Sequence, residues 1–211
     1  MSVSYKNKIY MGRNVEWNQL LDKSKFKSTS TLDGVSIKNN GDGTYTLNGT
    51  FTADSARWFG FYTDEDLSIA KRLYGHKVLY GFVLNANYKL ENTALGMSYE
   101  INNTSTNGTV FYVYSGKSCI VSQTLNKVAP ADITKSIFYI VLRAPSSGTS
   151  VYKDVVVRPQ LFDLTQMFGA GNEPATPEEF WSYFDHKVYL YNTGETQPLF
   201  KISRKSQWGG V

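Results

Sequence analysis

The feature that most constrains the fold of this sequence is a repeated alternation of short apolar and aromatic runs with polar turns across residues 28–163. About nine runs of strand length follow one another at a spacing of roughly ten residues, and helical segments do not alternate with them. The runs are residues 35–38, 44–52, 55–62, 77–88, 95–101, 110–114, 119–124, 136–144 and 150–162. This pattern predicts a mainly β fold, an antiparallel β-sandwich resembling a jelly roll, and argues against a parallel α/β sheet.

The clearest hairpin signal is the sequence NNGDG at residues 39–43, between the first two runs. Asn and Gly supply the positive φ angles that a tight connection needs. The helical pattern inside the β region is residues 64–74, which place Leu67, Ala70 and Leu73 on one face. We therefore expect one hairpin here and one short helix later in the sandwich.

The chain divides into an N-terminal docking arm at residues 1–27, a β-sandwich at 28–163, and a C-terminal region at 164–211. The C-terminal region predicts two short helices, a final strand and a tail that pack on the sandwich or on a partner. The apolar residues of the arm either pack on their own domain or dock on a neighbouring subunit. The candidate assembly contacts are Trp17, Leu20, Leu21 and Trp208.

Capping residues mark where the two C-terminal helices begin and end. Asp163 is a candidate N-cap for the first helix, and Gly169 is its candidate stop. Thr176 is a candidate N-cap for the second helix, and Pro177 fits its first position. The aromatic residues that follow, including Phe180, are expected to press onto the sandwich.

The net charge of +4 is concentrated at the N-terminus. Residues 1–27 carry six basic and two acidic groups, whereas residues 28–163 contribute only +1 and residues 164–211 contribute −1. Nucleic-acid binding needs a clustered basic stripe, so we expect no nucleic-acid partner. The sequence contains no membrane-spanning run and no apolar segment typical of a secretory signal, so we expect a protein made in a cytoplasm without membrane insertion.

Side chains suited to catalysis are few. Cys119 is the single cysteine, so an internal disulfide is excluded, and with only His76 and His186 beside it a structural zinc site is excluded too. Hydrolase, P-loop, zinc-protease and EF-hand motifs do not occur. Both histidines are better interpreted as satisfied or exposed surface residues. We therefore predict a protein that is not an enzyme and has no cofactor.

Acidic residues leave two alternatives open. A glycan hydrolase needs two carboxylates that face one cleft, and Glu91 and Glu100 stand on or near strands. Calcium prefers hard oxygen ligands, which Asp42 or the acidic run at residues 64–66 would supply. Capping of the following helix explains that acidic run more simply.

Aromatic residues are the best candidates for binding a ligand. Trp58, Tyr62, Tyr112 and Tyr114 lie on predicted strands, and the spacing of Tyr112 and Tyr114 places them on one face. Exposed rings at these positions would stack on a glycan or anchor a protein interface. The alternative interpretation is that these faces form the core.

The most specific segment of the sequence is VVVRPQLFDLTQMFGAGNEPATPEEFWSYF. Together with SYKNKIYMGRNVEWNQLLDKSKF and VSIKNNGDGTYTLNGTFT, it resembles modules in tail-fibre, baseplate and other minor structural proteins of tailed phages and prophages of gut bacteria. In those proteins a β-sandwich similar to carbohydrate-binding jelly rolls precedes a segment of this kind. The matching positions are Pro159, Leu161, Asp163, Leu164, Thr165, Met167, Phe168, Gly169, Gly171, Asn172, Glu173, Pro174, Thr176, Glu178, Glu179 and Phe180.

The resemblance implies a virion structural protein, either a head or tail decoration or a fibre component, with other virion proteins as partners. It also implies a carbohydrate-binding-like sandwich that faces outward, and it favours a homotrimer. A receptor-binding or adhesion module for bacterial surface glycan is the alternative, and a glycan hydrolase is a minor one. The segment itself reads as structural, with binding of a sugar or metal by Asn172 and Glu173 as the alternative.

Overall fold

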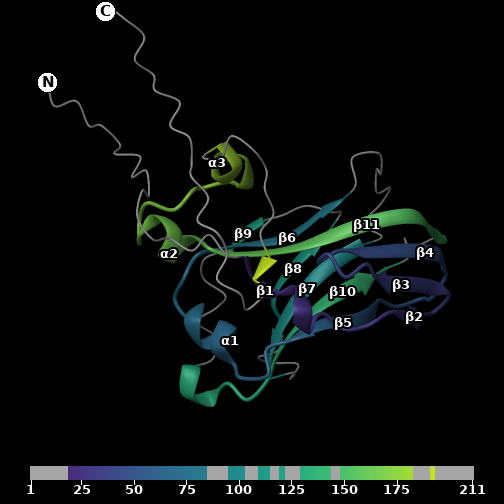
Figure 1. Ribbon diagram of the computed structural model, residues 1–211, viewed down its shortest axis with the longest axis horizontal. Coiled ribbons are helices and arrows are strands. Elements are labelled where there is room, and N and C mark those ends of the chain that lie inside the picture. Colours follow the sequence, from purple (N-terminus) through teal and green to yellow (C-terminus); the bar gives the residue numbers. More distant parts are fainter. Residues whose placement is uncertain are drawn as a thin grey trace, which may run out of the picture.

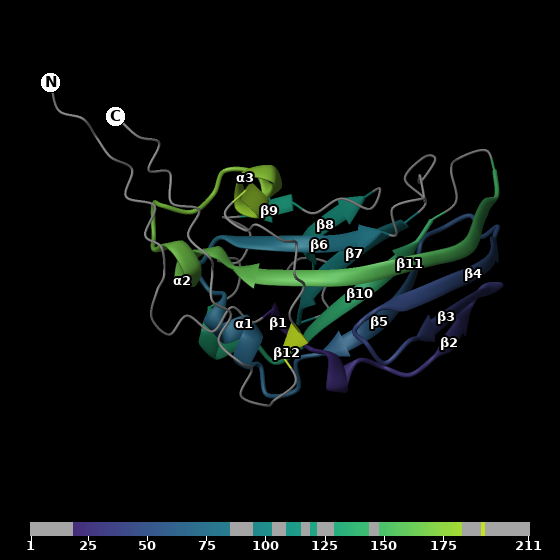
Figure 2. The same ribbon diagram turned by 45° about the horizontal axis from the view of Figure 1, so that its top comes forward.

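The computed structural model describes residues 19–84, 95–102, 109–114, 119–121, 129–143, 148–182 and 191–192. Within these residues two antiparallel sheets face each other, and short helices gather at one end (Figure 1 and Figure 2). The predicted fold class, a mainly β protein built on an antiparallel sandwich, is therefore confirmed.

The larger sheet has six strands and contains the predicted hairpin. Its spatial order is β2 (Ser30–Leu32), β3 (Val35–Asn39), β4 (Tyr45–Phe51), β11 (Ser150–Asp163), β6 (Val78–Leu84) and β9 (Cys119–Val121). The turn between β3 and β4 is fixed by two short bonds, from Gly41 N to Asn39 Oδ1 at 2.8 Å and from Thr44 N to Asp42 Oδ1 at 2.9 Å. Side-chain oxygens thus fold this turn locally, as its Asn, Asp and Gly content predicts.

The smaller sheet has four strands in the order β5 (Arg57–Thr63), β10 (Ser136–Leu142), β7 (Leu95–Ile101) and β8 (Thr109–Tyr114). Pairing between β10 and β5 is interrupted, because Phe138 lies opposite Tyr62 whereas Tyr139 lies opposite Gly60. Phe61 is the extra residue in this bulge, and both Phe61 and Tyr62 are buried. The bulge therefore breaks the simple alternation of faces along β5.

Aromatic rings join the two sheets across the core. Tyr45 of β4 packs edge-on against Phe59 of β5 with the ring centroids 5.7 Å apart. Tyr80 of β6 reaches across to Phe138 of β10 at 5.9 Å, and its hydroxyl donates to the carbonyl oxygen of Ser98 at 2.8 Å. A buried tyrosine hydroxyl needs such a partner, so this bond fixes how the sheets face each other.

The first described residues pack on the sandwich. Leu20 and Leu21 are 7% and 0% exposed and belong to the core, and Phe26 packs against core rings. We therefore correct the expectation that Leu20 and Leu21 contact another subunit, because apolar burial already occurs within their own domain. Trp17 and Trp208 lie outside the described residues.

The strand β1 (Gln19–Asp22) pairs in parallel with β12 (Tyr191–Asn192). This pairing brings segments from near the two ends of the described chain side by side (Figure 2). The expected final strand near residues 187–191 falls mostly outside the described residues and overlaps β12 at Tyr191 alone.

The helices are short. They are α1 (Ser68–Arg72), α2 (Leu164–Phe168) and α3 (Pro177–Ser182), and 3-10 turns occur at Lys23–Lys25 and Pro130–Asp132. The helix α1 begins later than the one predicted for residues 64–74, because Leu67 before it adopts a left-handed backbone conformation with a φ of +57°. The carboxylates of Asp64 and Asp66 accept the backbone N–H groups of Ala70 and Ser68. These bonds satisfy backbone N–H groups in the first turn of the helix, which have no partner within the helix itself.

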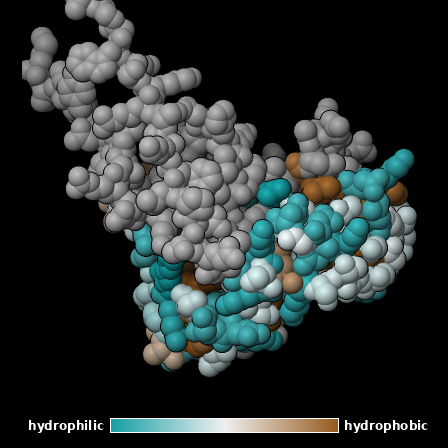
Figure 3. All heavy atoms as spheres, in the orientation of Figure 1, coloured by the Kyte–Doolittle hydropathy of each residue, from teal (hydrophilic) through white to brown (hydrophobic). Residues whose placement is uncertain are grey.

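Over the part of the chain that the structure describes, no helix is both long and apolar enough to cross a membrane. Hydrophilic and intermediate residues dominate the coloured surface in Figure 3, and hydrophobic residues show through only in small patches.

Candidate functional site

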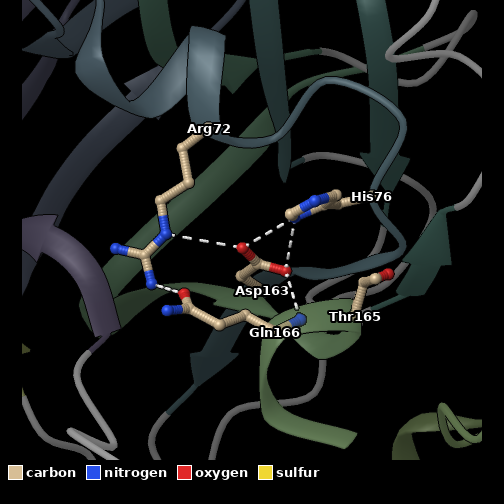
Figure 4. A pocket seen from close by; sticks show the side chains of 5 residues that line it. All are labelled: Arg72, His76, Asp163, Thr165 and Gln166. Carbon is tan, nitrogen blue, oxygen red and sulfur yellow. Dashed lines mark hydrogen bonds and ion pairs between the residues drawn. The ribbon is translucent and has the colours of Figure 1, made fainter. Parts of the chain in front are cut away.

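A pocket of about 550 Å³ opens where the end of α1 meets the start of α2 (Figure 4). Its lining residues are Arg72, His76, Asp163, Thr165 and Gln166. The Asp163 side chain is only 2% exposed, whereas those of Arg72 and His76 are 44% and 34% exposed. A nearly buried carboxylate thus lies beneath two cationic or potentially cationic groups.

The Asp163 carboxylate binds groups from three segments. Its Oδ1 accepts the N–H of Gln166 at 3.0 Å, which confirms Asp163 as the N-cap of α2. Its Oδ2 lies 2.9 Å from His76 Nδ1 and 3.4 Å from Arg72 Nε. Arg72 also donates to the side-chain oxygen of Gln166. One carboxylate therefore ties the end of α1, the turn before β6 and the start of α2 together.

His76 is a satisfied histidine, as the sequence predicted. An aspartate that holds an imidazole nitrogen also occurs in catalytic sites, where it orients a general base. Here the same carboxylate caps α2 and binds Arg72, so the folding of this end of the sandwich accounts for its contacts. We call Arg72, His76 and Asp163 the end clasp.

The loop after α2 folds back on itself through Glu173. Thr165 Oγ1 donates to Glu173 Oε1 at 2.8 Å, and the N–H of Gly171 donates to Oε2 at 2.8 Å. Desolvation by burial raises the pKa of Glu173, but hydrogen bonds from Thr165 and Gly171 lower it by more, so the pKa of Glu173 lies below its ordinary value. The backbone N–H of Asn172 donates to the Gly169 carbonyl oxygen at 3.0 Å. These contacts support the structural interpretation of this segment.

The predicted start of the second helix is confirmed. Thr176 Oγ1 accepts the N–H of Glu179 at 3.1 Å, and the Glu179 carboxylate accepts the N–H of Ala175 at 2.8 Å. This reciprocal pattern is a variant of the capping box, in which the Glu179 carboxylate binds the N–H of Ala175, one residue before the cap, instead of the N–H of Thr176. Phe180 is 1% exposed and packs on Phe162 with ring centroids 5.2 Å apart, so α3 lies on the sheet as expected.

The outer face of the four-stranded sheet carries the second candidate site. Trp58 of β5 is 38% exposed and meets the half-buried Tyr139 of β10 with ring centroids 5.8 Å apart and ring planes at 90°. The Tyr139 ring lies over Gly60, since a Cβ built at Gly60 would approach that ring to 3.3 Å. Glu100 of β7 is on the same face, and burial raises the pKa of Glu100.

The structure places the four predicted binding aromatics differently from one another. Trp58 is exposed, as its proposed role requires. Tyr62 is 3% exposed and packs against Phe138 in the core, so we correct its assignment as a binding residue; the bulge in β5 turns it inward. Tyr112 and Tyr114 lie opposite Ser98 and Gly96 in the strand register, and their side chains are outside the described residues.

The acidic residues considered above for calcium binding and hydrolysis have the following contacts in the structure. Asp42 accepts the N–H and the hydroxyl of Thr44, and it belongs to the hairpin turn. Asp64 and Asp66 cap α1. Among the described residues, no group of three or more His, Cys, Asp or Glu side chains gathers in a way that would hold a metal ion. Glu91, like His186, lies outside the described residues.

Two important residues were missed by the sequence reasoning. Tyr139 alternates along β10 with the core residues Phe138 and Ile140, so strict alternation would have assigned it to the outer face. Arg72 gave no local signal, because its partner Asp163 is far away in the sequence. Only the folded structure brings Arg72 and Asp163 together.

Comparison with known proteins adds no relative. No protein-family model matches the chain, and neither a curated protein nor a solved structure is significantly similar to it.

Proposed function

We propose that this protein is a non-enzymatic structural protein of a phage virion, a head or tail decoration or a fibre component. The observation that carries the proposal is the segment from Pro159 to Phe180, which resembles phage structural modules and is used here to close one end of the sandwich. Its polar side chains bond within the fold: Asp163 in the end clasp, Glu173 in its loop, and Glu179 in the capping box.

The architecture supports the same proposal. The antiparallel sandwich carries its capped helices at one end, where α2 and α3 pack on part of the larger sheet. Such a unit is suited to repeated display on a particle, because it buries its apolar residues in a core of its own. Under this proposal it is located in the virion and contacts other virion proteins.

The test is to find the protein in particles. Particles are purified on a density gradient from a culture that produces the chain, and an antibody against the recombinant protein is applied in electron microscopy. We expect regular labelling at one position on a head or tail, which antibody absorbed with the recombinant protein does not give. Protein that is abundant in the cell lysate but missing from the particles would contradict the proposal.

A receptor-binding role is the second candidate, favoured by one observation. Trp58 presents a large ring on the outer face of the four-stranded sheet, perpendicular to Tyr139, and Tyr139 in turn lies close enough to Glu100 to interact with it. Large exposed aromatic groups beside a carboxylate are typical of surfaces that recognise a ligand.

A further inference from the structure

The outer face of the four-stranded sheet combines aromatic, small and acidic residues in a defined register. In β10 the residues Ile137, Tyr139 and Val141 alternate with core residues, so they lie on the outer face, where Ile137 and Tyr139 are partly exposed and Val141 is buried. Strand pairing sets Trp58 opposite Val141 and sets Glu100 opposite Ile137. Tyr139 therefore lies between Trp58 on one side and Glu100 on the other.

The two rings form a corner. The 90° angle between Trp58 and Tyr139 places the edge of one ring against the face of the other, an arrangement that fixes both side chains without covering either ring completely. Gly60 beneath Tyr139 has no side chain, and a Cβ there would press on both Tyr139 and Ile137 at 3.3 Å. The glycine thus lets the Tyr139 ring lie low against the sheet.

Polar groups adjoin this corner. Burial raises the pKa of Glu100 and also that of Tyr139, whose pKa the Glu100 carboxylate raises further, so these two groups are close enough to interact. Lys135 acts on Glu100 in the opposite direction. The hydroxyl of Ser98, opposite Tyr139 in the register, is buried and has no hydrogen-bond partner among the described groups.

We propose that Trp58, Tyr139 and Glu100 form a binding platform for an uncharged saccharide, which deepens the second candidate function above. A sugar ring has one face of C–H groups that stacks on an aromatic ring, and its hydroxyl groups donate to a carboxylate at the edge of that ring.

The charge of the platform selects the class of saccharide. An acidic sugar would bring a second carboxylate next to Glu100, and two carboxylates at close range repel each other. A neutral sugar instead uses Glu100 as a hydrogen-bond acceptor, and bonds of this charge-assisted kind are stronger than neutral ones. The expected ligand is therefore a neutral hexose or N-acetylhexosamine unit of a surface polysaccharide.

The experiment is a glycan array of bacterial surface polysaccharides, with neutral and acidic members, probed with the full chain. The strongest neutral hit is then titrated by calorimetry. Trp58→Ala should weaken the Kd by about tenfold or more, the effect of removing a central aromatic anchor. Trp58→Phe should retain part of the affinity, and Glu100→Gln should weaken binding with the fold intact by circular dichroism.

Val151→Ala is the matched control, because Val151 is an exposed apolar residue on the larger sheet and should leave the Kd unchanged. The proposal is overturned if no neutral glycan gives a signal, if binding is confined to acidic glycans, or if folded Trp58→Ala binds like the unmodified chain. Particle labelling does not depend on this result, so a virion protein that binds no glycan remains a distinguishable outcome.

Discussion

Asp163 Oδ2 lies 2.9 Å from Nδ1 of His76, a residue 87 positions earlier in the chain. The contact joins the end of β11 to the turn that leads into β6, at the point where α2 begins. Asp163 and Val78 are also paired in the sheet. Strand pairing therefore brings these two segments together, and the side-chain contact between Asp163 and His76 adds a second link between them.

The first prediction concerns the end clasp. Asp163→Ala removes the N-cap of α2 and leaves Arg72 and His76 without their carboxylate, so we expect a loss of about 2–3 kcal/mol in the free energy of unfolding. Asp163→Asn retains a cap acceptor but removes the charge, and should cost about 1 kcal/mol. Urea denaturation followed by fluorescence measures both.

Asp132→Ala is the matched control, because Asp132 is an exposed aspartate in a 3-10 turn and its loss should change stability by less than about 0.5 kcal/mol. Equal losses for Asp163→Ala and Asp132→Ala would contradict a structural role for the clasp.

The sequence predicted the fold better than it predicted the sites, and the reason is the range of the interactions involved. The turn at residues 39–43, the cap at Asp163 and the capping box at Thr176 are bonds between near neighbours, so local residue types specify them. Strand alternation likewise depends on adjacent residues.

The sites depend on contacts that local patterns do not encode. A one-residue bulge at Phe61 turns Tyr62 into the core while leaving Trp58 outside. Gly60 precedes the bulge, but a glycine within a strand indicates either a bulge or a close backbone approach, so the run SARWFGFY does not by itself locate the bulge. The clasp likewise needs Arg72 and Asp163, which meet only because β11 and β6 pair. The sequence therefore does not predict the contacts in this protein that depend on how distant strands pair.

The second prediction tests the close approach of β3 and β4. Gly49 has a φ of +131°, and a Cβ there would lie 2.1 Å from the carbonyl oxygen of Gly34. Gly49→Ala must move one strand of the hairpin, so we expect a loss of about 3 kcal/mol or more. Thermal unfolding by calorimetry measures it.

Gly41→Ala separates the two causes. Gly41 also has a positive φ, +78°, but nothing lies within 4 Å of a Cβ built there. This variant should lose only the backbone preference, about 1 kcal/mol. If Gly41→Ala were as destabilising as Gly49→Ala, backbone conformation rather than the clash with Gly34 would explain both.

The third prediction concerns alkaline pH. Burial raises the pKa of Tyr45, Tyr62 and Tyr99 above the ordinary value of 10.0. The unfolded chain releases these protons first, so their contribution to stability is complete below pH 10 and is lost as the pH rises further. Each tyrosine should steepen the loss by about 1.4 kcal/mol per pH unit.

Tyrosinate absorbance and unfolding are to be followed together above pH 10. We expect these three phenols to ionise only as the protein unfolds, and Tyr45→Phe to lessen the slope of stability against pH by one group. Ionisation of every tyrosine while the fold stays intact would show that the phenols are reached by solvent and would refute the prediction.

The last prediction asks whether the segment that carries the phage resemblance is structural. Glu173 accepts one hydrogen bond from Thr165 and one from Gly171, and Gln offers only one acceptor oxygen, so Glu173→Gln leaves one donor facing an amide. Because Glu173 is partly exposed, solvent screening limits the expected loss to about 1 kcal/mol at neutral pH. Urea denaturation at several pH values measures it.

The sign of the pH dependence distinguishes this carboxylate from a ligand-binding one. The pKa of Glu173 is lowered from 4.5, so its contribution to stability is present above pH 4.5 and disappears as the pH falls through the folded-state pKa. The difference between Glu173→Gln and the unmodified chain should therefore shrink in acid, while Glu178→Gln, at an exposed position in α3, stays close to the unmodified chain throughout. If the Glu173→Gln protein is as stable as the unmodified chain at every pH, Glu173 does not stabilise the loop. The structural interpretation of the segment would then be wrong.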